Sequence, residues 1–187
     1  MILPIMAYGS PVLKQKAGFI DKDYPGLTEL IKNMFETMYK APGVGLAAPQ
    51  VGISIRLFVI DATPYSDEDP SLKGSKKVFI NPEILNSDGD PYKFNEGCLS
   101  IPHIREDIER PPQIRLRYQD EDFKQYEEDF SGILARIIQH EYDHVDGILF
   151  TDRISAFKKT LLKSKLQNIS KGNIQVDYKM KFPLFRR

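Results

Sequence analysis

The sequence predicts an α+β fold in which mainly antiparallel sheets surround a central helix with an H-E-x-x-H motif, followed by a C-terminal helix and a short tail. Strand patterns come before helical patterns rather than alternating with them, which favours antiparallel pairing. Residues 113–118 and 124–130 flank a polar turn, as in an antiparallel hairpin. With 187 residues, 41% of them hydrophobic, the chain can bury a sizeable core.

The first half of the chain predicts an arm, a helix and two strands. Residues 4–20 have scattered apolar residues and predict an irregular arm. Apolar residues repeat at helical spacing between Leu27 and Met38, with a proline before and after the run. Strands are expected over residues 53–60 and, interrupted by a proline, over 77–85, followed by a turn over 86–91.

The second half predicts a hairpin and two helices. The expected elements, in order, are an extended segment over 96–102, the hairpin, a helix that starts at Ser131 and stops at Gly147, an amphipathic helix from Ile154 to near Gly172, and a weak edge strand within 175–182.

The composition suits a cytoplasmic protein. Cys98 is the only cysteine, which excludes an internal disulfide and suits a reducing compartment. No signal peptide or apolar run of transmembrane length is visible, so no membrane partner is expected. Charge is unevenly spread: residues 153–187 contain ten basic residues and one acidic residue, although the whole chain has 26 of each. This basic piece is either a solvated surface or a docking surface for a polyanion.

The segment Gln139-His140-Glu141-Tyr142-Asp143-His144 ends an apolar helical run. Residues four apart lie on one face of a helix, so both histidines can bind one metal ion. Glu141 lies one step round, close enough to act on a metal-bound water without being a ligand. A histidine on an apolar face is more often a packed core residue, but two of the three histidines in the chain fall inside this motif.

A catalytic metal of this kind needs a third protein ligand and a fourth position for water. No Glu follows Glu141, and Phe150 stands where a metzincin protease would have its third histidine. Cys98 is the best remaining candidate, although a lone Cys is usually a small buried apolar residue. His103 could instead close a structural zinc site with four protein ligands. Other possible ligands are Asp143, Asp146 and Asp152.

Three segments, in order, resemble the three signature motifs of the peptide deformylase family. They are Gly43-Val44-Gly45-Leu46-Ala47-Ala48-Pro49-Gln50, Glu96-Gly97-Cys98-Leu99-Ser100 and the H-E-x-x-H segment. Each motif alone is moderately specific, and the ordered set is highly specific. The resemblance implies a catalytic domain over residues 1–170, with residues 171–187 as a tail extension of the same domain.

The resemblance implies a metal-dependent hydrolase that removes the formyl group from the N-terminal formyl-methionine of nascent proteins. It implies Cys98, His140 and His144 as ligands of one divalent metal ion. The family metal in the cell is Fe2+, and Zn2+, Ni2+ or Co2+ can occupy the site in isolated protein; the donor atoms fit iron and zinc alike. Metal-generated hydroxide would attack the formyl carbon, with Glu141 as general base and then general acid.

The resemblance also implies groups that bind the substrate. The Gln50 side-chain amide and the Leu99 backbone N–H would stabilise the oxyanion. Gly45 would let the backbone lie against the peptide like an added strand. The other matching substrate positions are Val44, Phe94, Ile133 and Ile137 for the methionine pocket, and Arg105. These four apolar residues are equally well explained as ordinary members of the hydrophobic core. Glu96 and Arg110 resemble a buried ion pair that supports the Cys98 segment.

The chain departs from the usual family pattern at His103, where Gly or an acidic residue is more common, and in the tail after Lys171. The resemblance implies a ribosome surface as a partner of the basic C-terminal helix, without sequence-specific nucleic-acid recognition. Two alternatives remain: a metalloprotease, which would cleave unformylated peptides, and a closed zinc module. His103→Ala would strip the metal from a closed module but would leave metal and activity in a deformylase.

Overall fold

The computed structural model describes residues 1–184, which form three sheets and three α-helices. The strands are β1 (Ile5–Met6), β2 (Gly45–Ala47), β3 (Leu57–Ile60), β4 (Lys77–Asp88), β5 (Tyr92–Cys98), β6 (Ile101–Arg110), β7 (Gln113–Gln119), β8 (Gln125–Ser131) and β9 (Met180–Lys181). The α-helices are α1 (Leu27–Lys40), α2 (Gly132–Val145) and α3 (Ala156–Lys171). Short 3-10 turns are η1 (Pro11–Lys14), η2 (Ala48–Val51), η3 (Thr63–Tyr65), η4 (Pro70–Leu72) and η5 (Phe150–Asp152).

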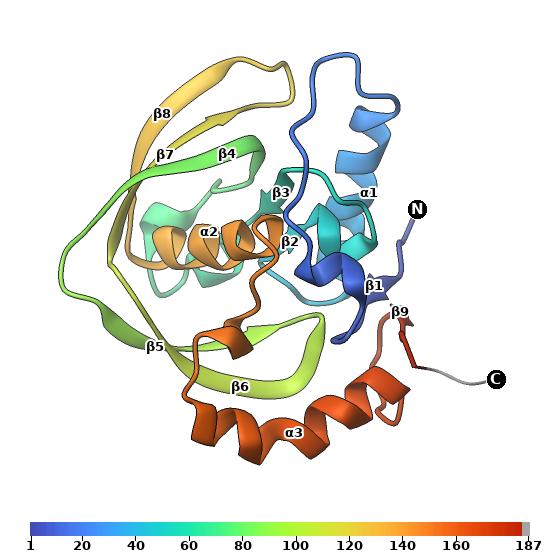
Figure 1. The fold of residues 1–187 in the computed structure, drawn as a ribbon. Coiled ribbons are helices and arrows are strands. Elements are labelled where there is room, and N and C mark those ends of the chain that lie inside the picture. The colour runs from blue at the N-terminus through green and yellow to red at the C-terminus, as the bar shows by residue number, and fades with distance from the viewer. Residues whose placement is uncertain (185–187) are drawn as a thin grey trace.

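Helix α2 lies near the centre of the molecule, between a curved sheet and a hairpin (Figure 1). The sheet has the strand order β2-β3-β4-β7-β8, and all its neighbours pair antiparallel. Strands β5 and β6 form the separate antiparallel hairpin. The α+β prediction with a central H-E-x-x-H helix and a C-terminal helix is therefore confirmed. One pair, β1 with β9, is parallel and joins the two ends of the chain.

Several predicted boundaries were wrong. The strand expected over 53–60 begins only at Leu57, because residue 55 instead bridges to Gly18 in the arm. Strand β4 runs through the expected turn as far as Asp88, with a register shift where Pro82 interrupts it. Proline has no N–H for the ladder, which explains the shift. The segment expected to be extended over 96–102 contains a two-residue turn between β5 and β6.

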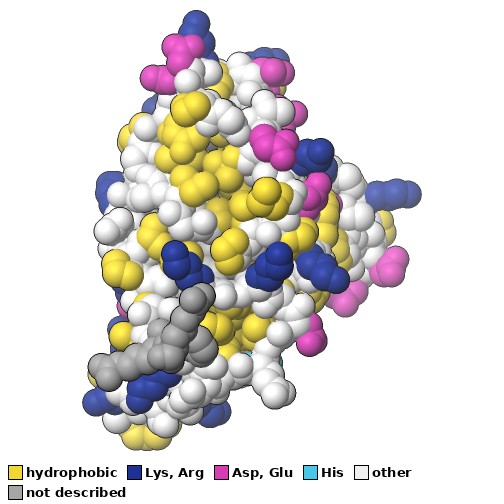
Figure 2. All heavy atoms as spheres, turned by 90° about the vertical axis from the view of Figure 1, so that its right-hand side faces the viewer, with side chains coloured by type: hydrophobic (Ala, Val, Ile, Leu, Met, Phe, Trp, Pro, Cys, Tyr) yellow, Lys and Arg dark blue, Asp and Glu magenta, His cyan; other side chains and the backbone are white. Residues whose placement is uncertain are grey.

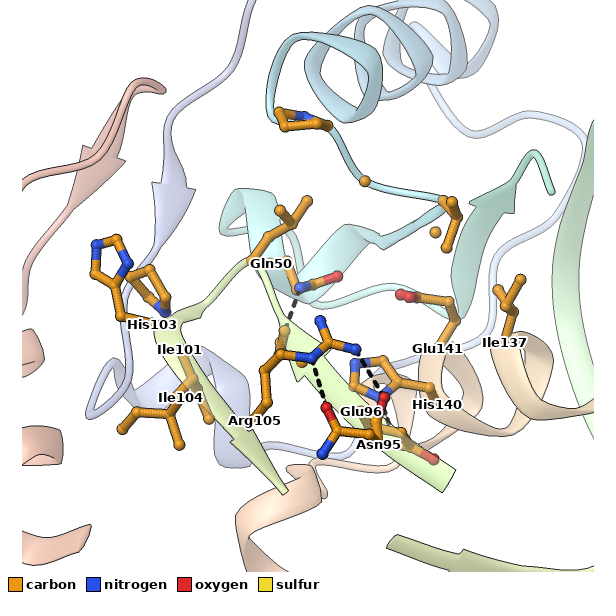
Figure 3. Close-up of a pocket in the computed structure, with 18 of the residues that line it drawn as sticks. Gln50, Asn95, Glu96, Ile101, His103, Ile104, Arg105, Ile137, His140 and Glu141 are labelled. Atoms are coloured by element: carbon orange, nitrogen blue, oxygen red, sulfur yellow. Dashed lines mark hydrogen bonds and ion pairs between the residues drawn. The ribbon is translucent and has the colours of Figure 1, made fainter. Parts of the chain in front are cut away.

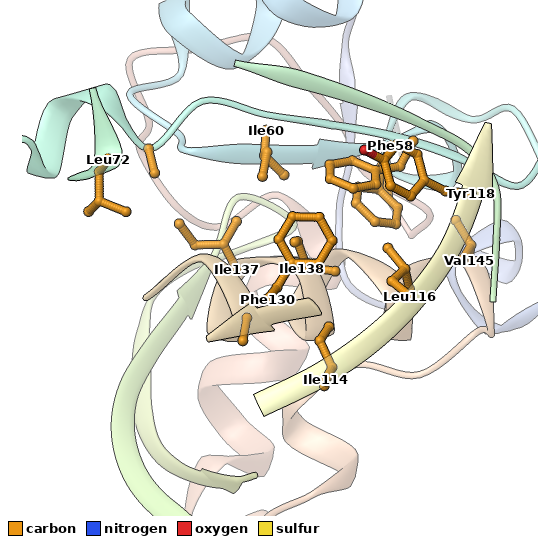
Figure 4. Close-up of a cluster of buried hydrophobic side chains, with 14 of the residues drawn as sticks. Phe58, Ile60, Leu72, Ile114, Leu116, Tyr118, Phe130, Ile137, Ile138 and Val145 are labelled. Carbon is orange, nitrogen blue, oxygen red and sulfur yellow. The ribbon is translucent and has the colours of Figure 1, made fainter. Parts of the chain in front are cut away.

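A buried hydrophobic cluster fixes the position of α2 against the large sheet (Figure 4). Ile138 of α2 is fully buried, and Phe58 and Phe79 stack in the same cluster with ring centroids 4.7 Å apart. Burying one such side chain contributes about 1.5–3 kcal/mol, so this apolar face sets the rotation of the helix. His140 and His144 consequently face away from the sheet core, toward β5.

The ends of α2 follow the predicted boundaries. Ser131 is the N-cap residue in an extended conformation, although its side chain makes no capping hydrogen bond. After the helix ends at Val145, Gly147 has φ +74° and its N–H donates to the His144 carbonyl at 3.2 Å. A Cβ at residue 147 would also lie 2.9 Å from the Lys14 backbone carbonyl carbon. Glycine is therefore needed here both for its conformation and for the close approach of the arm.

The C-terminal part packs beneath the β5–β6 hairpin (Figure 1). Helix α3 buries Leu162, Leu166 and Ile169 in a cluster with residues of β6. After Gly172, alternate tail residues are half-buried, but the predicted edge strand is limited to Met180–Lys181. Figure 2 views the right-hand side of Figure 1, the side of β1 and β9, where Lys and Arg side chains cross the middle and lower parts. Across residues 1–184, no helix combines the length and apolar character needed to cross a membrane.

Candidate metal centre and substrate pocket

Cys98, His140 and His144 converge at the junction of β5 and α2. Each offers one potential ligand atom, and these three atoms lie within 4.8 Å of one another. The Cys98 Sγ is 3.3 Å from the His144 Nε2, and the two histidine ring centroids are 5.1 Å apart. The expected i, i+4 spacing on α2 brings the two imidazoles to the same side, and the end of β5 supplies the sulfur. The structure therefore brings together the three residues expected as ligands.

A buried ion-pair network holds His140 in place. The His140 Nδ1 lies 2.9 Å from the Glu96 Oε2, which leaves the Nε2 toward Cys98 and His144. Arg110 donates to both Glu96 oxygens at 2.8 and 3.0 Å and to Asp143 at 2.7 Å. The Glu96–Arg110 pair expected from the sequence is present. A carboxylate behind a metal-binding histidine sets the ring orientation and tautomer, so the network supports the ligand role of His140.

The electrostatics of this centre favour a positive charge among the three donors. Burial acts to lower the pKa of His140, but hydrogen bonds to Cys98 and Glu96 outweigh it and raise the pKa to about 10. Burial and the charge of His140 together hold the pKa of His144 well below its usual value. The same surroundings that raise the pKa of His140 would favour a divalent cation among the three donors. One thiolate and two imidazoles suit zinc and ferrous iron, so the residues fit a metal.

Glu141 lies beside the centre in a buried position. Its Oε2 has no hydrogen-bond partner among the described residues. Burial raises the pKa of Glu141 to about 7, with His140 acting in the opposite direction. A carboxyl with a pKa near 7 can accept and return a proton at neutral pH, which suits a general acid/base. The adjacent backbone at Gly45 approaches closely, because a Cβ there would lie 2.7 Å from the Glu141 Cδ.

Gln50 is fixed by the short turn η2. Its Oε1 accepts the Ala47 N–H at 2.8 Å, which orients the amide group. Its Nε2 then faces the Cys98 Sγ at 3.5 Å and the Ser100 Oγ at 3.3 Å. Leu99 follows Cys98 in the turn between β5 and β6 and lines the same pocket. The two residues expected as oxyanion donors therefore both lie next to Cys98.

A pocket of about 470 Å³ opens in front of this centre. Figure 3 shows Ile137 and Glu141 at one end, Gln50 between, and His103 at the opposite end. All the residues expected to bind substrate line it: Val44, Gly45, Phe94, Arg105, Ile133 and Ile137. Arg105 bonds to Asn95 through its Nε and Nη2, each at 2.7 Å, and so crosses the hairpin at the pocket rim. Ile137 is buried and also belongs to the cluster of α2, so pocket and core share a wall.

Several residues of the site were missed in the sequence. Arg136 is buried, donates to Glu96 at 3.2 Å and lies 4.5 Å from the Tyr92 ring centroid. Its position next to the motif on α2 was the available indication. Asp143, which the sequence offered as a possible metal ligand, instead pairs with Arg110 and Arg153 and lies outside the donor group. The tail residues Gln175–Tyr178 also line the pocket, and no local pattern in the sequence indicates this.

His103 lies outside the group of three donors. Its Nε2–H donates instead to the Gln175 carbonyl oxygen at 2.7 Å. The structure therefore gives no support to a closed zinc site that includes His103.

Comparison with known proteins agrees with this geometry. Residues 2–160 match the family model described as polypeptide deformylase. A peptide deformylase of Christiangramia forsetii is 58% identical over 190 residues, covering 98% of this chain and 97% of the relative. The crystal structure of the Thermus thermophilus peptide deformylase is similar with a TM-score of 0.82 and 38% identity, over 92% of this chain and 100% of that one.

A Legionella pneumophila peptide deformylase gives a TM-score of 0.81 with 37% identity, over 92% of this chain and 98% of that one. The matches extend through both the H-E-x-x-H helix and the hairpin that carries Cys98. The chain belongs to the polypeptide deformylase family, whose members remove the formyl group from N-terminal formylmethionine.

Proposed function

We propose that this chain carries out deformylation at the centre formed by Cys98, His140 and His144, with Glu141 moving the proton. The observation that carries the proposal is the convergence of the three donors within 4.8 Å, beside a buried carboxyl and at the floor of a peptide-sized pocket. The reaction adds water to the formyl carbon, breaks the carbon–nitrogen bond, and yields formate and a free N-terminal amine.

The three donors would hold one divalent metal ion. When bound, such an ion polarises a carbonyl oxygen and lowers the pKa of water. Membership of the family favours Fe2+ in the cell, with Zn2+, Ni2+ or Co2+ able to bind in the isolated protein, and the thiolate and imidazole donors fit iron and zinc alike. Glu96 holds His140 through its Nδ1, so this nitrogen keeps its proton and the Nε2 remains free to bind.

Glu141 would move the proton through its Oε2. This atom is buried and has no partner among residues 1–184, so nothing described competes for the proton. The carboxylate accepts a proton from the attacking water and returns it to the departing amine nitrogen. General acid/base catalysis of this kind contributes about 10²–10⁴-fold in rate.

Gln50 and Leu99 would stabilise the negative charge that develops on the formyl oxygen. The Gln50 Nε2 already faces the Cys98 sulfur, and the Leu99 N–H belongs to the residue after Cys98. Donors that are fixed before the reaction need no reorganisation as the charge develops. The Ala47 N–H supplies this fixation for Gln50.

The rest of the pocket would bind the methionine side chain and the peptide backbone. Val44, Phe94, Ile133 and Ile137 would provide apolar surface in the pocket that Glu141 also lines. Gly45 lies in an edge strand, β2, and can lie against an extended peptide. Arg105 at the rim offers a positive charge to the peptide beyond its first residue.

A formate-release assay tests the proposal. The metal-loaded protein should release formate from formyl-Met-Ala-Ser and should not cleave unformylated Met-Ala-Ser. Peptide-bond cleavage of the unformylated peptide, without formate release from the formylated one, would indicate a metalloprotease and would contradict deformylation.

We also propose that α3 docks on the ribosome, in the cytoplasm, where nascent formylated chains emerge. The helix carries exposed lysines beside two exposed apolar residues, Phe157 (72% exposed) and Leu161 (63%). Ribosomal RNA is a polyanion, so binding should be strongest in low salt. We treat residues 1–170 as the catalytic unit and 171–187 as its extension.

Charge reversal tests the docking. Lys159→Glu combined with Lys163→Glu should reduce co-sedimentation with ribosomes in low salt. Lys32→Glu with Lys40→Glu in α1, which changes the net charge equally, should not. Equal pelleting of both variants would contradict docking through α3.

A further inference from the structure

The C-terminal tail returns to the pocket and touches the turn that follows Cys98. The Tyr178 hydroxyl donates to the Leu99 carbonyl oxygen at 2.8 Å. Tyr178 is half-buried, and its ring packs in the same cluster as the Leu99 side chain. The contact joins residues 79 positions apart and lies within the lining of the pocket.

The turn is held from both ends of the chain. The Tyr8 N–H, just after β1, donates to the Ser100 carbonyl oxygen at 2.9 Å. Tyr178, just before β9, holds the neighbouring Leu99 carbonyl. Because β1 and β9 pair with each other, the two donors belong to one structural unit. Gln50 adds a third contact through the Ser100 hydroxyl.

A strained residue on β6 anchors the same tail. The register shifts between the pairs Gly97–Arg105 and Cys98–Ile101, so residues 102–104 form a bulge. Within it His103 has φ +65°, a conformation that non-glycine residues rarely adopt. Its Nε2–H bonds the Gln175 carbonyl, which lies three residues before Tyr178. The bulge at His103 and the tail after Lys171, two departures from the usual family sequence, therefore meet at one contact.

We propose that Tyr178 is a positioning residue for the deformylation reaction: it holds the Leu99 carbonyl and so restricts the backbone of Leu99, whose N–H would point at the developing oxyanion. The inference rests on the proposed function of Leu99. Tyr178 acts through Leu99 and does not itself touch the reacting atoms. The tail is thereby a working part of the active site rather than an appendage.

The contact should affect the transition state more than substrate binding. Holding the Leu99 and Ser100 carbonyls limits the backbone rotation of the turn, and with it the orientation of the Leu99 N–H, before charge develops. Removal of one neutral hydrogen bond should lower kcat by about 2- to 10-fold. The KM for formyl-Met-Ala-Ser should stay unchanged, because the pocket walls keep their shape.

Tyr178→Phe tests the proposal, because it removes the hydroxyl and keeps the ring that packs against the turn. Tyr126→Phe is the matched control: Tyr126 is also half-buried, and its hydroxyl donates to Asp120 at 2.9 Å, in the hairpin β7–β8 away from the pocket. Both zinc-loaded variants are compared with the wild type for kcat, KM and metal content. Amide hydrogen exchange of residues 98–101 provides a readout that does not depend on activity.

The expected result is a lower kcat with unchanged KM and metal content in Tyr178→Phe alone, together with about 2- to 10-fold faster exchange in the turn. Equal kcat in both variants, or a raised KM with unchanged kcat, would overturn the positioning role. If the wild-type protein released no formate, the proposed function would fail. Unchanged amide exchange of the turn in Tyr178→Phe would instead show that the Tyr178 hydroxyl does not hold the turn. The two failures are therefore distinguishable.

Discussion

The backbone of Gly45 lies against the side chain of Glu141 so closely that an added Cβ would be 2.7 Å from the carboxyl carbon and nearer still to Oε1. Real Cβ atoms essentially never approach so closely, so the glycine keeps open the space that the carboxyl fills. The first motif therefore does more than bind substrate backbone, because it also sets the position of the proposed proton carrier.

Gly45→Ala should displace the Glu141 carboxyl and lower kcat by about 10-fold or more, since a misplaced proton carrier loses much of its contribution. Metal content should stay at the wild-type level, because the three donors are not touched. The measurement is steady-state formate release with metal analysis. Gly18→Ala is the control, since its Cβ would meet nothing nearer than 3.8 Å. Full activity in Gly45→Ala would show that the carboxyl is free to move.

Glu141→Gln should bind metal like the wild type and lose activity by about 10²–10⁴-fold. The amide has the shape of the carboxyl and fits beside Gly45, but it cannot accept the proton. Metal content and formate release measured on the same preparation check this prediction. Loss of the metal together with activity would instead make Glu141 part of the metal-binding group.

Arg110→Leu should destabilise the fold by about 3–5 kcal/mol, because it leaves Glu96 and Asp143 buried without their shared partner. Arg115→Leu removes the exposed pair with Asp129 and should cost no more than about 1 kcal/mol. Urea unfolding of both variants at equal zinc concentration gives the comparison. Similar midpoints would mean that the buried network contributes little to stability.

His103→Ala should retain the metal and keep activity within about twofold, since His103 lies outside the donor group and the tail keeps its Tyr178 and β9 contacts. Loss of one exposed hydrogen bond has a small net effect. Metal analysis after dialysis checks this outcome. Stoichiometric loss of zinc would instead support a closed zinc site in which His103 is the fourth protein ligand.

The parts of this fold that could be predicted are the elements specified by short-range sequence patterns. The spacing of apolar residues on α2 and the position of Gly147 predicted this helix and its end. The hairpin of β7 and β8 followed from alternation on both sides of a polar turn. In both cases neighbours in sequence are neighbours in space, so short-range periodicity was enough.

The unpredicted parts depend on contacts between distant segments. Of the residues that are common in tight turns, the turn at Leu99 and Ser100 contains only Ser100, which is a weak indication on its own. It is held instead by Tyr8 and Tyr178, from opposite ends of the chain. The parallel pairing of β1 with β9 likewise has no local pattern. The donor group itself was assembled from the motifs, but the wall formed by the tail could be found only in the structure.

The most direct test of the central claim is a crystal structure of the metal-loaded protein with anomalous scattering data collected at the metal edge. The account predicts one strong peak within bonding distance of the Cys98 Sγ and of the Nε2 atoms of His140 and His144, with a remaining position taken by a non-protein ligand. A peak remote from Cys98, or one enclosed by four protein ligands, would contradict it.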